Sequence, residues 1–460
     1  MMKRACNPQS VTRSRPAGML PLTALALALV GGASCAASPS RPGADGGADS
    51  GLLSCGTADP TLHAADAAEL FAATRVPTFD FVLPPADWES LKTHARDEEY
   101  VEAQVCYDGR PVGKVGLRFK GSYGSLYECF DAQGNLTCPR LSMKVKFDEY
   151  VAGQRFFGLK RLAFNAYVHD DSRMKEKLAY DLFRAMDIVA PRSAWAVVRV
   201  NGQSQGLFGM VEPVDGRFTA DRWPTNPNGN LYKELWPTHA SDAQILTALE
   251  TNEEAPDVSH YRAFAQAVTS ATDANLLATL GSYMDTNQLA RFLAVEDAIA
   301  SYDGITYFWT DGVNTNNHNF FVYEESPHRF TVIPWDLDST LWINPDHAAP
   351  HWTTIPADCS RTYPYWGGLA SAAGCDGVFR AMHKDLGPWR TAARQLLDGP
   401  FSVNALVATI DNYTQVIVEA AHADPTPTKY ATFDQTVAGL RSSIPALRAR
   451  LEELIAAPAP

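Results

Sequence analysis

Two acidic residues, Asp336 and Asp338, directly follow the strand-like run "FTVIPW". Just upstream, the amide-rich loop "NTNNHN" places Asn319 in front of a second strand-like run, "FFVY". Mg²⁺ prefers oxygen ligands and commonly takes one or two carboxylates together with phosphate oxygens. The pattern fits a metal site formed by Asn319, Asp336 and Asp338 and a polar strand end about equally well, and the surrounding motifs described below favour the metal site.

Three further features could handle phosphate. Lys144 and Lys146, in "LSMKVKF", are two residues apart and so share one face of a predicted strand. Glu176 lies between two lysines in a predicted helix. Taken alone, each feature fits an ordinary charged surface better than a phosphate site. The turn "KGSYGS" presents Gly121, Ser122 and Gly124, whose main-chain N–H groups could face phosphates, although a tight turn explains these residues too.

These residues need elements to position them. Alternating patterns predict strands over 112–121 and 140–150, and helical spacing predicts a helix over 170–187. Residues 194–215 predict a hairpin that turns at Asn201-Gly202. Helical patterns then run to about Ala300. Two strands flank "EESPH", and helical segments over 377–420 and 433–457 follow.

The order of these motifs is more specific than any one of them. It runs through "LRFKGSYGS", "LSMKVKF", "FFGLKRLAFNAYVHDDSRMKEKLAYDLFRAMDI", "VRVNGQSQGLFGMVEPVD", "GNLYK", "HNFFVY" and "VIPWDLD", over about 117–340. This order resembles the spore coat protein H (CotH) kinase family, an atypical kinase-like group. The resemblance implies an α+β, two-lobed protein-kinase-like fold. It would have a β-rich N-lobe with one key helix and a larger, mostly helical C-lobe. The implied cofactors are ATP with Mg²⁺ or Mn²⁺.

The resemblance also implies roles for single residues. Lys144 would bind the phosphates, with Lys146 as a less secure substitute, and Glu176 would orient Lys144. Glu212, before Pro213, would lie at the hinge between the lobes. Further positions implied in cofactor binding are Gly121, Ser122, Gly124 and Lys233, and Asn319, Asp336 and Asp338 would hold the metal.

Two residues are candidates for the catalytic base, which accepts the proton of the substrate hydroxyl. Asp303 stands seven residues after Glu296, and Asp311 stands closer to the "HN" motif. Each is followed by glycine, and only one can be the equivalent position. We prefer Asp303 and retain Asp311.

Charge limits the possible partners. The chain has 460 residues and a formal net charge of −13, and its leader contains only basic charges. The rest of the chain is therefore more acidic still, about −17 without the four basic residues of the leader. Because nucleic-acid binding needs a basic face, we expect no nucleic-acid partner.

The N-terminus predicts export. Basic residues precede the apolar run "MLPLTALALALV", which is followed by "GGAS" and Cys35. We therefore assign residues 1–34 to a signal peptide, with lipidation of Cys35 and ordinary cleavage as alternatives. A lipid at Cys35 would be the one link to a membrane. We further predict a flexible linker over 35–75, the N-lobe over 76–214 and the C-lobe over 215–460.

Cysteine usage agrees with export. Beyond the leader and Cys35 the chain has an even number of cysteines without CxxC spacing, which favours disulfides over zinc: Cys55, Cys106, Cys129, Cys138, Cys359 and Cys375. The close pairs Cys129/Cys138 and Cys359/Cys375 are candidate disulfides.

Together these patterns predict an exported, CotH-like kinase that transfers the γ-phosphate of Mg-ATP to Ser or Thr of a surface or matrix protein. The alternative is a non-catalytic surface or assembly module that keeps the fold and binds a divalent metal such as Ca²⁺. Transfer of a nucleotidyl group would use the same residues.

Overall fold

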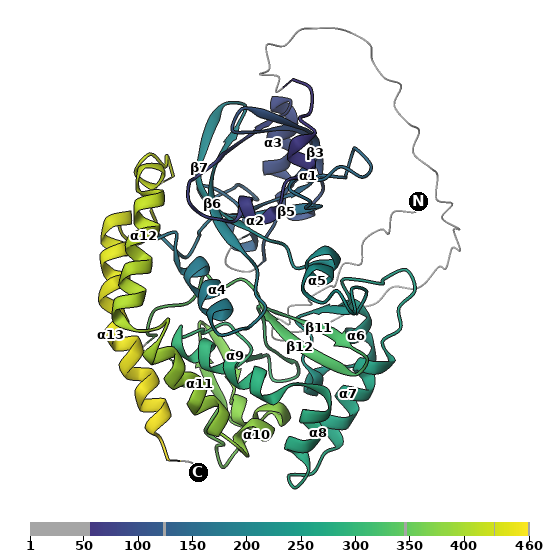
Figure 1. The fold of residues 1–460 in the computed structure, drawn as a ribbon, viewed down its shortest axis with the longest axis vertical. Helices are drawn as coiled ribbons and strands as arrows, with labels where there is room; N and C mark the ends of the chain where they lie inside the picture. Colours follow the sequence, from purple (N-terminus) through teal and green to yellow (C-terminus); the bar gives the residue numbers. More distant parts are fainter. Residues whose placement is uncertain (1–55, 123–125, 345–346, 427, 459–460) are drawn as a thin grey trace, which may run out of the picture. The chain divides into compact units, whose positions relative to one another are not determined.

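The structure, a computed structural model, describes residues 56–122, 126–344, 347–426 and 428–458. The predicted signal peptide (1–34), Cys35, Cys55 and Gly124 lie outside these residues. Helices and strands alternate through the described chain, so the predicted α+β class is confirmed (Figure 1).

Seven strands of the described chain close into a barrel, in the order β1-β2-β3-β4-β5-β7-β6. Neighbouring strands are antiparallel except for β1 and β6, whose parallel pairing closes the barrel. Closure leaves no sheet edge unpaired. The strands are β1 (Thr78–Val82), β2 (Val101–Tyr107), β3 (Arg110–Phe119), β4 (Met143–Lys146), β5 (Arg161–Asn165), β6 (Ser193–Val200) and β7 (Gln203–Val211).

The alternation of β4 decides where its lysine points. Met143 and Val145 are buried in the barrel core, so Lys144 lies on the outer face. Lys144 is paired with Arg118 of β3 and Ala163 of β5. Ala163 belongs to the core around helix α4 rather than to the barrel core, so this outer face is turned toward α4.

Short helices cover the barrel: α1 (Thr61–Ala64), α2 (Ala67–Leu70) and α3 (Pro85–Thr93). The first two lie within 35–75, the predicted flexible linker. Leu62 and Leu70 are buried against the barrel core. The described part of that linker is therefore folded onto the barrel, because its apolar residues find a buried surface there.

The predicted hairpin over 194–215 is confirmed as β6 and β7. Its turn residues Asn201 and Gly202 have φ angles of 51° and 76°. A two-residue turn of this kind needs positive φ at both positions, which Asn-Gly tolerates best.

Helix α4 (Lys175–Ala185) follows β5 and buries Leu178, Leu182 and Phe183. The carboxylate of Asp170 accepts hydrogen bonds from the main-chain N–H groups of Ser172 and Lys175, both at 2.9 Å. The predicted helix over 170–187 is thus present but starts later, because residues 170–174 form a turn in which Asp170 accepts the N–H of Lys175, the first residue of the helix.

Two smaller sheets follow in the chain. The first has the strand order β12-β11-β8 and contains β8 (Leu231–Lys233), β11 (Phe320–Ser326) and β12 (Arg329–Pro334). The second has the strand order β10-β9-β14-β13 and contains β9 (Phe308–Thr310), β10 (Thr315–Asn316), β13 (Thr362–Tyr365) and β14 (Gly368–Ser371). The two strands predicted around "EESPH" are β11 and β12. Their register pairs Phe320 with Pro334, which brings Asn319 and Asp336 to the same end of the hairpin.

Helices make up most of the remaining chain, as predicted. They are α5 (Gly216–Arg222), α6 (Asp242–Thr247), α7 (Ser259–Ser270), α8 (Leu276–Tyr283), α9 (Thr286–Ala298), α10 (Gly377–His383), α11 (Gly387–Asp398), α12 (Val403–His422) and α13 (Phe433–Ala456). The rings of Phe183 in α4 and Phe292 in α9 are 4.8 Å apart, which joins α4 to this helical core. The last two helices, α12 and α13, run side by side as a long hairpin (Figure 1).

Two predicted disulfides are confirmed, Cys129–Cys138 and Cys359–Cys375. Cys106 is also disulfide-bonded. Within the described residues, none of the helices combines the length and the apolar character needed to cross a membrane.

Candidate active site

The predicted base Asp303 and the predicted metal ligand Asn319 are in direct contact. Asn319 donates its side-chain amide to Oδ2 of Asp303 at 2.8 Å and to the main-chain carbonyl of Asp303 at 2.9 Å. Because both partners are acceptors, the atom facing Asp303 is Nδ2. The Oδ1 atom of Asn319 is therefore turned away from Asp303 and is free to serve as a ligand.

Asp303 lies in the connection between α9 and β9 and is held from a second side. The indole N–H of Trp309 donates to its Oδ1 at 3.0 Å. Burial raises the pKa of Asp303 to about 6, against the opposing effects of Trp309 and His318. A carboxylate with a pKa near neutrality is suited to accept a proton.

Asp311, the other candidate base, is placed differently. It lies in the turn between β9 and β10, where its carboxylate accepts the N–H groups of Val313 at 2.8 Å and Asn314 at 2.7 Å. These hydrogen bonds lower the pKa of Asp311 to about 2. Its side chain is solvent-exposed and serves the turn, so the structure brings Asp303, and not Asp311, to Asn319.

Glu234 and His318 support the same loop. The Asn319 N–H donates to Glu234 at 3.3 Å, and Nδ1 of His318 lies 3.5 Å from the other oxygen of Glu234. Burial opposes the charged imidazolium, but Glu234 outweighs it and raises the pKa of His318. His318 is thus a hydrogen-bonding residue of the site.

Glu176 is buried, with 2% of its surface exposed, and faces the predicted metal-binding acids. Asn165 of β5 donates to both carboxylate oxygens, at 3.0 and 2.9 Å. The Tyr180 hydroxyl donates to Glu176 at 3.3 Å and accepts the N–H of Asp336 at 3.0 Å. Burial and the charge of Asp336 raise the pKa of Glu176 to about 7.

Asp336 and Asp338 lie just after β12, as predicted. Asp336 has a φ of 52° and Asn319 a φ of 64°, a backbone region that non-glycine residues rarely adopt outside turns and functional sites. Burial and the charges of Asp336, Glu176 and Asp170 raise the pKa of Asp338 well above its ordinary value. Four acidic side chains therefore repel one another here.

A cation would relieve this repulsion. In the described part of the chain, no lysine or arginine forms an ion pair with Glu176, Asp336 or Asp338. No three acidic, histidine or cysteine side chains of the described residues converge closely enough to bind a metal on their own.

Among the described residues Lys144 and Glu176 form no ion pair, and Glu176 accepts hydrogen bonds from Asn165 and Tyr180. Burial and the charges of Arg161 and Arg118 instead lower the pKa of Lys144 to about 8. Lys144 is thus a half-buried cation without an acidic partner among the described residues. Lys146, its substitute in the prediction, pairs with Glu149 at 2.6 Å.

Lys120, which was not predicted from the sequence, lies near the acidic residues Asp336 and Glu176. Its ammonium lies 5.7 Å from the ring centre of Trp335, the residue before Asp336. Its charge also acts on Glu176 in the direction that lowers the pKa of that residue. Lys120 makes no ion pair within the described residues, so it is a second cation available to phosphate.

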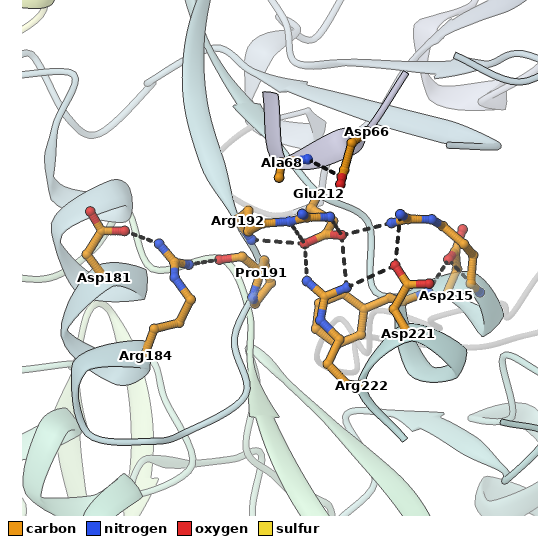
Figure 2. A network of polar contacts seen from close by, with 12 residues as sticks. Asp66, Ala68, Asp181, Arg184, Pro191, Arg192, Glu212, Asp215, Asp221 and Arg222 are labelled. Carbon is orange, nitrogen blue, oxygen red and sulfur yellow. Dashed lines mark hydrogen bonds and ion pairs between the residues drawn. The ribbon is translucent and has the colours of Figure 1, made fainter. Parts of the chain in front are cut away.

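Glu212 is occupied by arginines. Its fully buried carboxylate forms ion pairs with Arg192 at 2.6 Å, Arg222 at 2.5 Å and Arg217 at 3.1 Å (Figure 2). Burial opposes ionisation, but Arg192 and Arg222 outweigh it and lower the pKa of Glu212. This cluster ties the end of β7 to the start of β6 and to α5, so the Glu212 side chain is not free to bind a nucleotide.

The glycine turn and Lys233 are the remaining predicted residues. Gly121 has a φ of 148°, which favours glycine, and the carbonyl of the exposed Ser122 accepts the N–H of Leu126 at 2.9 Å. Lys233 is exposed at the end of β8, directly before Glu234. The structure thus places Lys233 beside the Glu234–His318 contact.

Sequence reasoning missed several supporting residues: Lys120, Asn165, Asp170, Tyr180, Glu234 and Trp309. Lys120 could have been found, because it stands directly before Gly121 in the quoted "KGSYGS". The others act through contacts between distant segments and leave no local pattern.

These features define a mixed α+β protein with an Asp–Asn pair and a partly buried acidic cluster, beside two lysines that form no ion pair within the described residues. The family described as CotH kinase protein matches residues 117–450, well over half of the chain, and the protein belongs to this family.

Similar proteins occur in bacteria and fungi. Inner spore coat protein H of Bacillus subtilis is 21% identical over 278 residues, which cover 58% of this chain and 69% of that protein. Spore coat protein homolog 1 of Rhizopus delemar is 23% identical over 211 residues, 43% of this chain and 32% of that protein. Invasin CotH7 of the same fungus is 22% identical over 224 residues, 47% of this chain and 36% of that protein. The matches thus span about a third of these fungal relatives.

Proposed function

We propose that this protein is a kinase that transfers the γ-phosphate of ATP to Ser or Thr hydroxyls of a protein at the cell surface or in a surface matrix. The observation that carries this proposal is the Asp303–Asn319 contact beside a buried acidic cluster that has no cation partner in the described chain. A proton acceptor and an amide ligand at one point are what phosphoryl transfer requires.

The chain's own residues would divide the work. Lys120, Lys144 and the main chain of Gly121 would hold the phosphate oxygens of ATP, and Asp336, Asp338 and Oδ1 of Asn319 would hold Mg²⁺ or Mn²⁺. The bound metal would neutralise phosphate charge. The substrate hydroxyl oxygen forms a bond to the γ-phosphorus as the bond to ADP breaks, and Asp303 takes the hydroxyl proton. Glu176 and Tyr180 would keep Asp336 in place.

A surface location would agree with the relatives and with the disulfides. The similar proteins carry the names spore coat protein and invasin. Disulfides are typical of proteins that reach an oxidising compartment. The predicted signal peptide, with or without a lipid on Cys35, would supply the route.

The test is transfer of label from γ-labelled ATP, with Mg²⁺ or Mn²⁺, to the chain itself and to a protein acceptor. We expect label with the wild-type protein and none with Asp336→Ala. Asp87→Ala, on the surface helix α3, is a control that should keep transfer. Label from α-labelled ATP would indicate nucleotidyl transfer. A folded protein that takes no label from either, and that Ca²⁺ alone stabilises against heat, would indicate the non-catalytic module.

A further inference from the structure

The connection between α12 and α13 contacts the barrel and the start of α4. We infer that Asp424 and Asp171 are positioning residues: through them this connection fixes α4, and with it Glu176 and Tyr180, beside Asp336. The structural part of this inference stands on contacts alone, and its consequence for catalysis rests on the proposed function.

Asp424 follows α12 and forms a buried ion pair with the barrel. Its Oδ2 atom lies 2.9 Å from Arg140 and 3.6 Å from Arg173, and it accepts the N–H of Leu207 in β7 at 3.1 Å. The side chains of Asp424 and Arg140 are 2% and 6% exposed. Removing one partner of such a pair leaves an uncompensated buried charge, which is strongly destabilising at that point.

Gly206 in β7 makes room for this contact. Its φ is 102°, and a Cβ atom there would lie 2.2 Å from Oδ1 of Asp424 and 2.5 Å from Arg140. A side chain at this position would displace the Asp424 carboxylate and the Arg140 guanidinium from each other. The close approach therefore depends on glycine.

Asp171 makes the second connection. Its carboxylate accepts three main-chain N–H groups from the end of the α12–α13 connection. They belong to Lys429 at 2.9 Å, Tyr430 at 2.6 Å and Ala431 at 3.2 Å. The preceding residue, Asp170, accepts the N–H of Lys175 at the start of α4. Two neighbouring carboxylates thus bind the start of α4 and the C-terminal hairpin, so neither can shift without the other.

A third contact lies along α4 itself. Tyr413 of α12 donates its hydroxyl to Asp181 of α4. Lys177 lies 3.2 Å from Asp181 and 5.0 Å from the ring centre of Tyr413. The hairpin therefore holds α4 at its start and along one face.

The other side of α4 faces the proposed site. Glu176 and Tyr180 are one turn apart on the helix, and the Tyr180 hydroxyl links Glu176 to the N–H of Asp336. A shift of α4 by about an ångström would break this link, and small misplacements of this kind cost catalysis heavily. The last helices of the chain thereby set the position of the acid that would hold the metal.

The experiment compares four variants of the full-length chain. Asp424→Asn removes the negative charge from the buried pair, and Gly206→Ala crowds the Asp424–Arg140 contact without changing charge. Asp411→Asn breaks an exposed Asp–Arg pair in the same hairpin, and Gly439→Ala adds a methyl group where no atom lies within 4 Å. Hydrogen exchange of the α4 amides is measured without nucleotide, and phosphate transfer is measured separately.

We expect the α4 amides to exchange about tenfold faster in Asp424→Asn and Gly206→Ala, with β2 and β3 unchanged, and no change in the two control variants. Transfer should fall in the first pair with little change in the KM for the protein acceptor. Unaltered α4 exchange in both Asp424→Asn and Gly206→Ala would overturn the inference, whatever happens to transfer. Faster α4 exchange in a protein whose wild type transfers no phosphate would support the positioning and refute the proposed function.

Discussion

Asn319 binds Asp303 twice, through the carboxylate and through the main-chain carbonyl. The two residues lie in different parts of the chain: Asp303 is in the loop after α9, and Asn319 directly precedes β11. A single amide group therefore couples the position of the proposed base to the position of a proposed metal ligand. Neither can move without changing the other, which preorganises the site before any substrate binds.

Replacement of the base separates the two candidates. We expect Asp303→Asn to lower kcat by about 10²- to 10⁴-fold, because the proton acceptor is lost, and the amide oxygen can keep only one of the two side-chain hydrogen bonds from Asn319 and Trp309. Asp311→Asn, in the exposed turn, should retain near wild-type transfer. The measurement is the initial rate of phosphate transfer at saturating ATP. An inactive Asp311→Asn with an active Asp303→Asn would reverse the assignment.

Lys120 and Lys144, which form no ion pair within the described residues, should both contribute to nucleotide binding. Lys120→Met and Lys144→Met are each expected to weaken Mg-ATP binding by about tenfold or more, since each removes a charge-assisted contact to phosphate. Lys146→Met serves as the control, because Lys146 already pairs with Glu149. Titration calorimetry gives the Kd directly. Equal affinities for Lys120→Met and wild type would remove Lys120 from the site.

The acidic cluster predicts a conflict between stability and function. Asp338→Asn removes one of four mutually repelling carboxyl groups, so without metal this variant should melt at a higher temperature than wild type. With Mg-ATP, the wild type should gain stability and the variant should gain less, because a ligand has been lost. Thermal unfolding in chelator and in Mg-ATP tests both statements. If Asp338→Asn were less stable than wild type in chelator, repulsion between Asp338 and the neighbouring carboxyl groups would not destabilise the metal-free protein.

Glu296 predicts a dependence of stability on pH. It is buried near Asp303, accepts the N–H of Ile305 at 3.2 Å, and has a pKa that burial raises from 4.5 to about 8. Because the folded state holds this proton more tightly than the unfolded state, its contribution to stability is full below pH 4.5 and is lost as the pH rises through 8.

Glu296→Gln mimics the protonated form at every pH. We therefore expect the variant to be more stable than wild type at pH 8 and about equally stable at pH 4.5, as measured by urea unfolding. The difference should grow steadily between these values. A constant difference across the range would mean that Glu296 does not titrate on unfolding.

Local pattern predicted much of the chain. The alternation around Lys144, the helical spacing of Leu178 and Leu182, and the Asn201-Gly202 turn all gave the correct element, because each depends on neighbouring residues only. Disulfide spacing gave the pairs Cys129–Cys138 and Cys359–Cys375. Asp311 is instructive, since an Asp-Gly pair, here with Asn314 two residues after the glycine, signals a turn as well as a site.

What the sequence did not predict depends on contacts between distant segments. The barrel closes through the parallel pairing of β1 with β6, and Asp171 binds residues more than 250 positions further along. No periodicity records such contacts. The contacts of Glu176 are of the same kind: Asn165, on a strand that the closed barrel positions, and Tyr180 donate hydrogen bonds to it, and the orienting role predicted for Glu176 stays a prediction.

The contacts of Asp424 and Ala431 also have a consequence for biosynthesis. A chain emerging from the ribosome displays every proposed catalytic residue before it displays the segment that secures α4. Until that segment has emerged, Arg140 lacks its ion-pair partner Asp424, and Asp171 lacks the main-chain N–H groups of residues 429–431. The proposed site would therefore stay without this support until residues 424–431 have emerged, and a chain that stops before Asp424 would carry the proposed site residues without the contacts that hold α4.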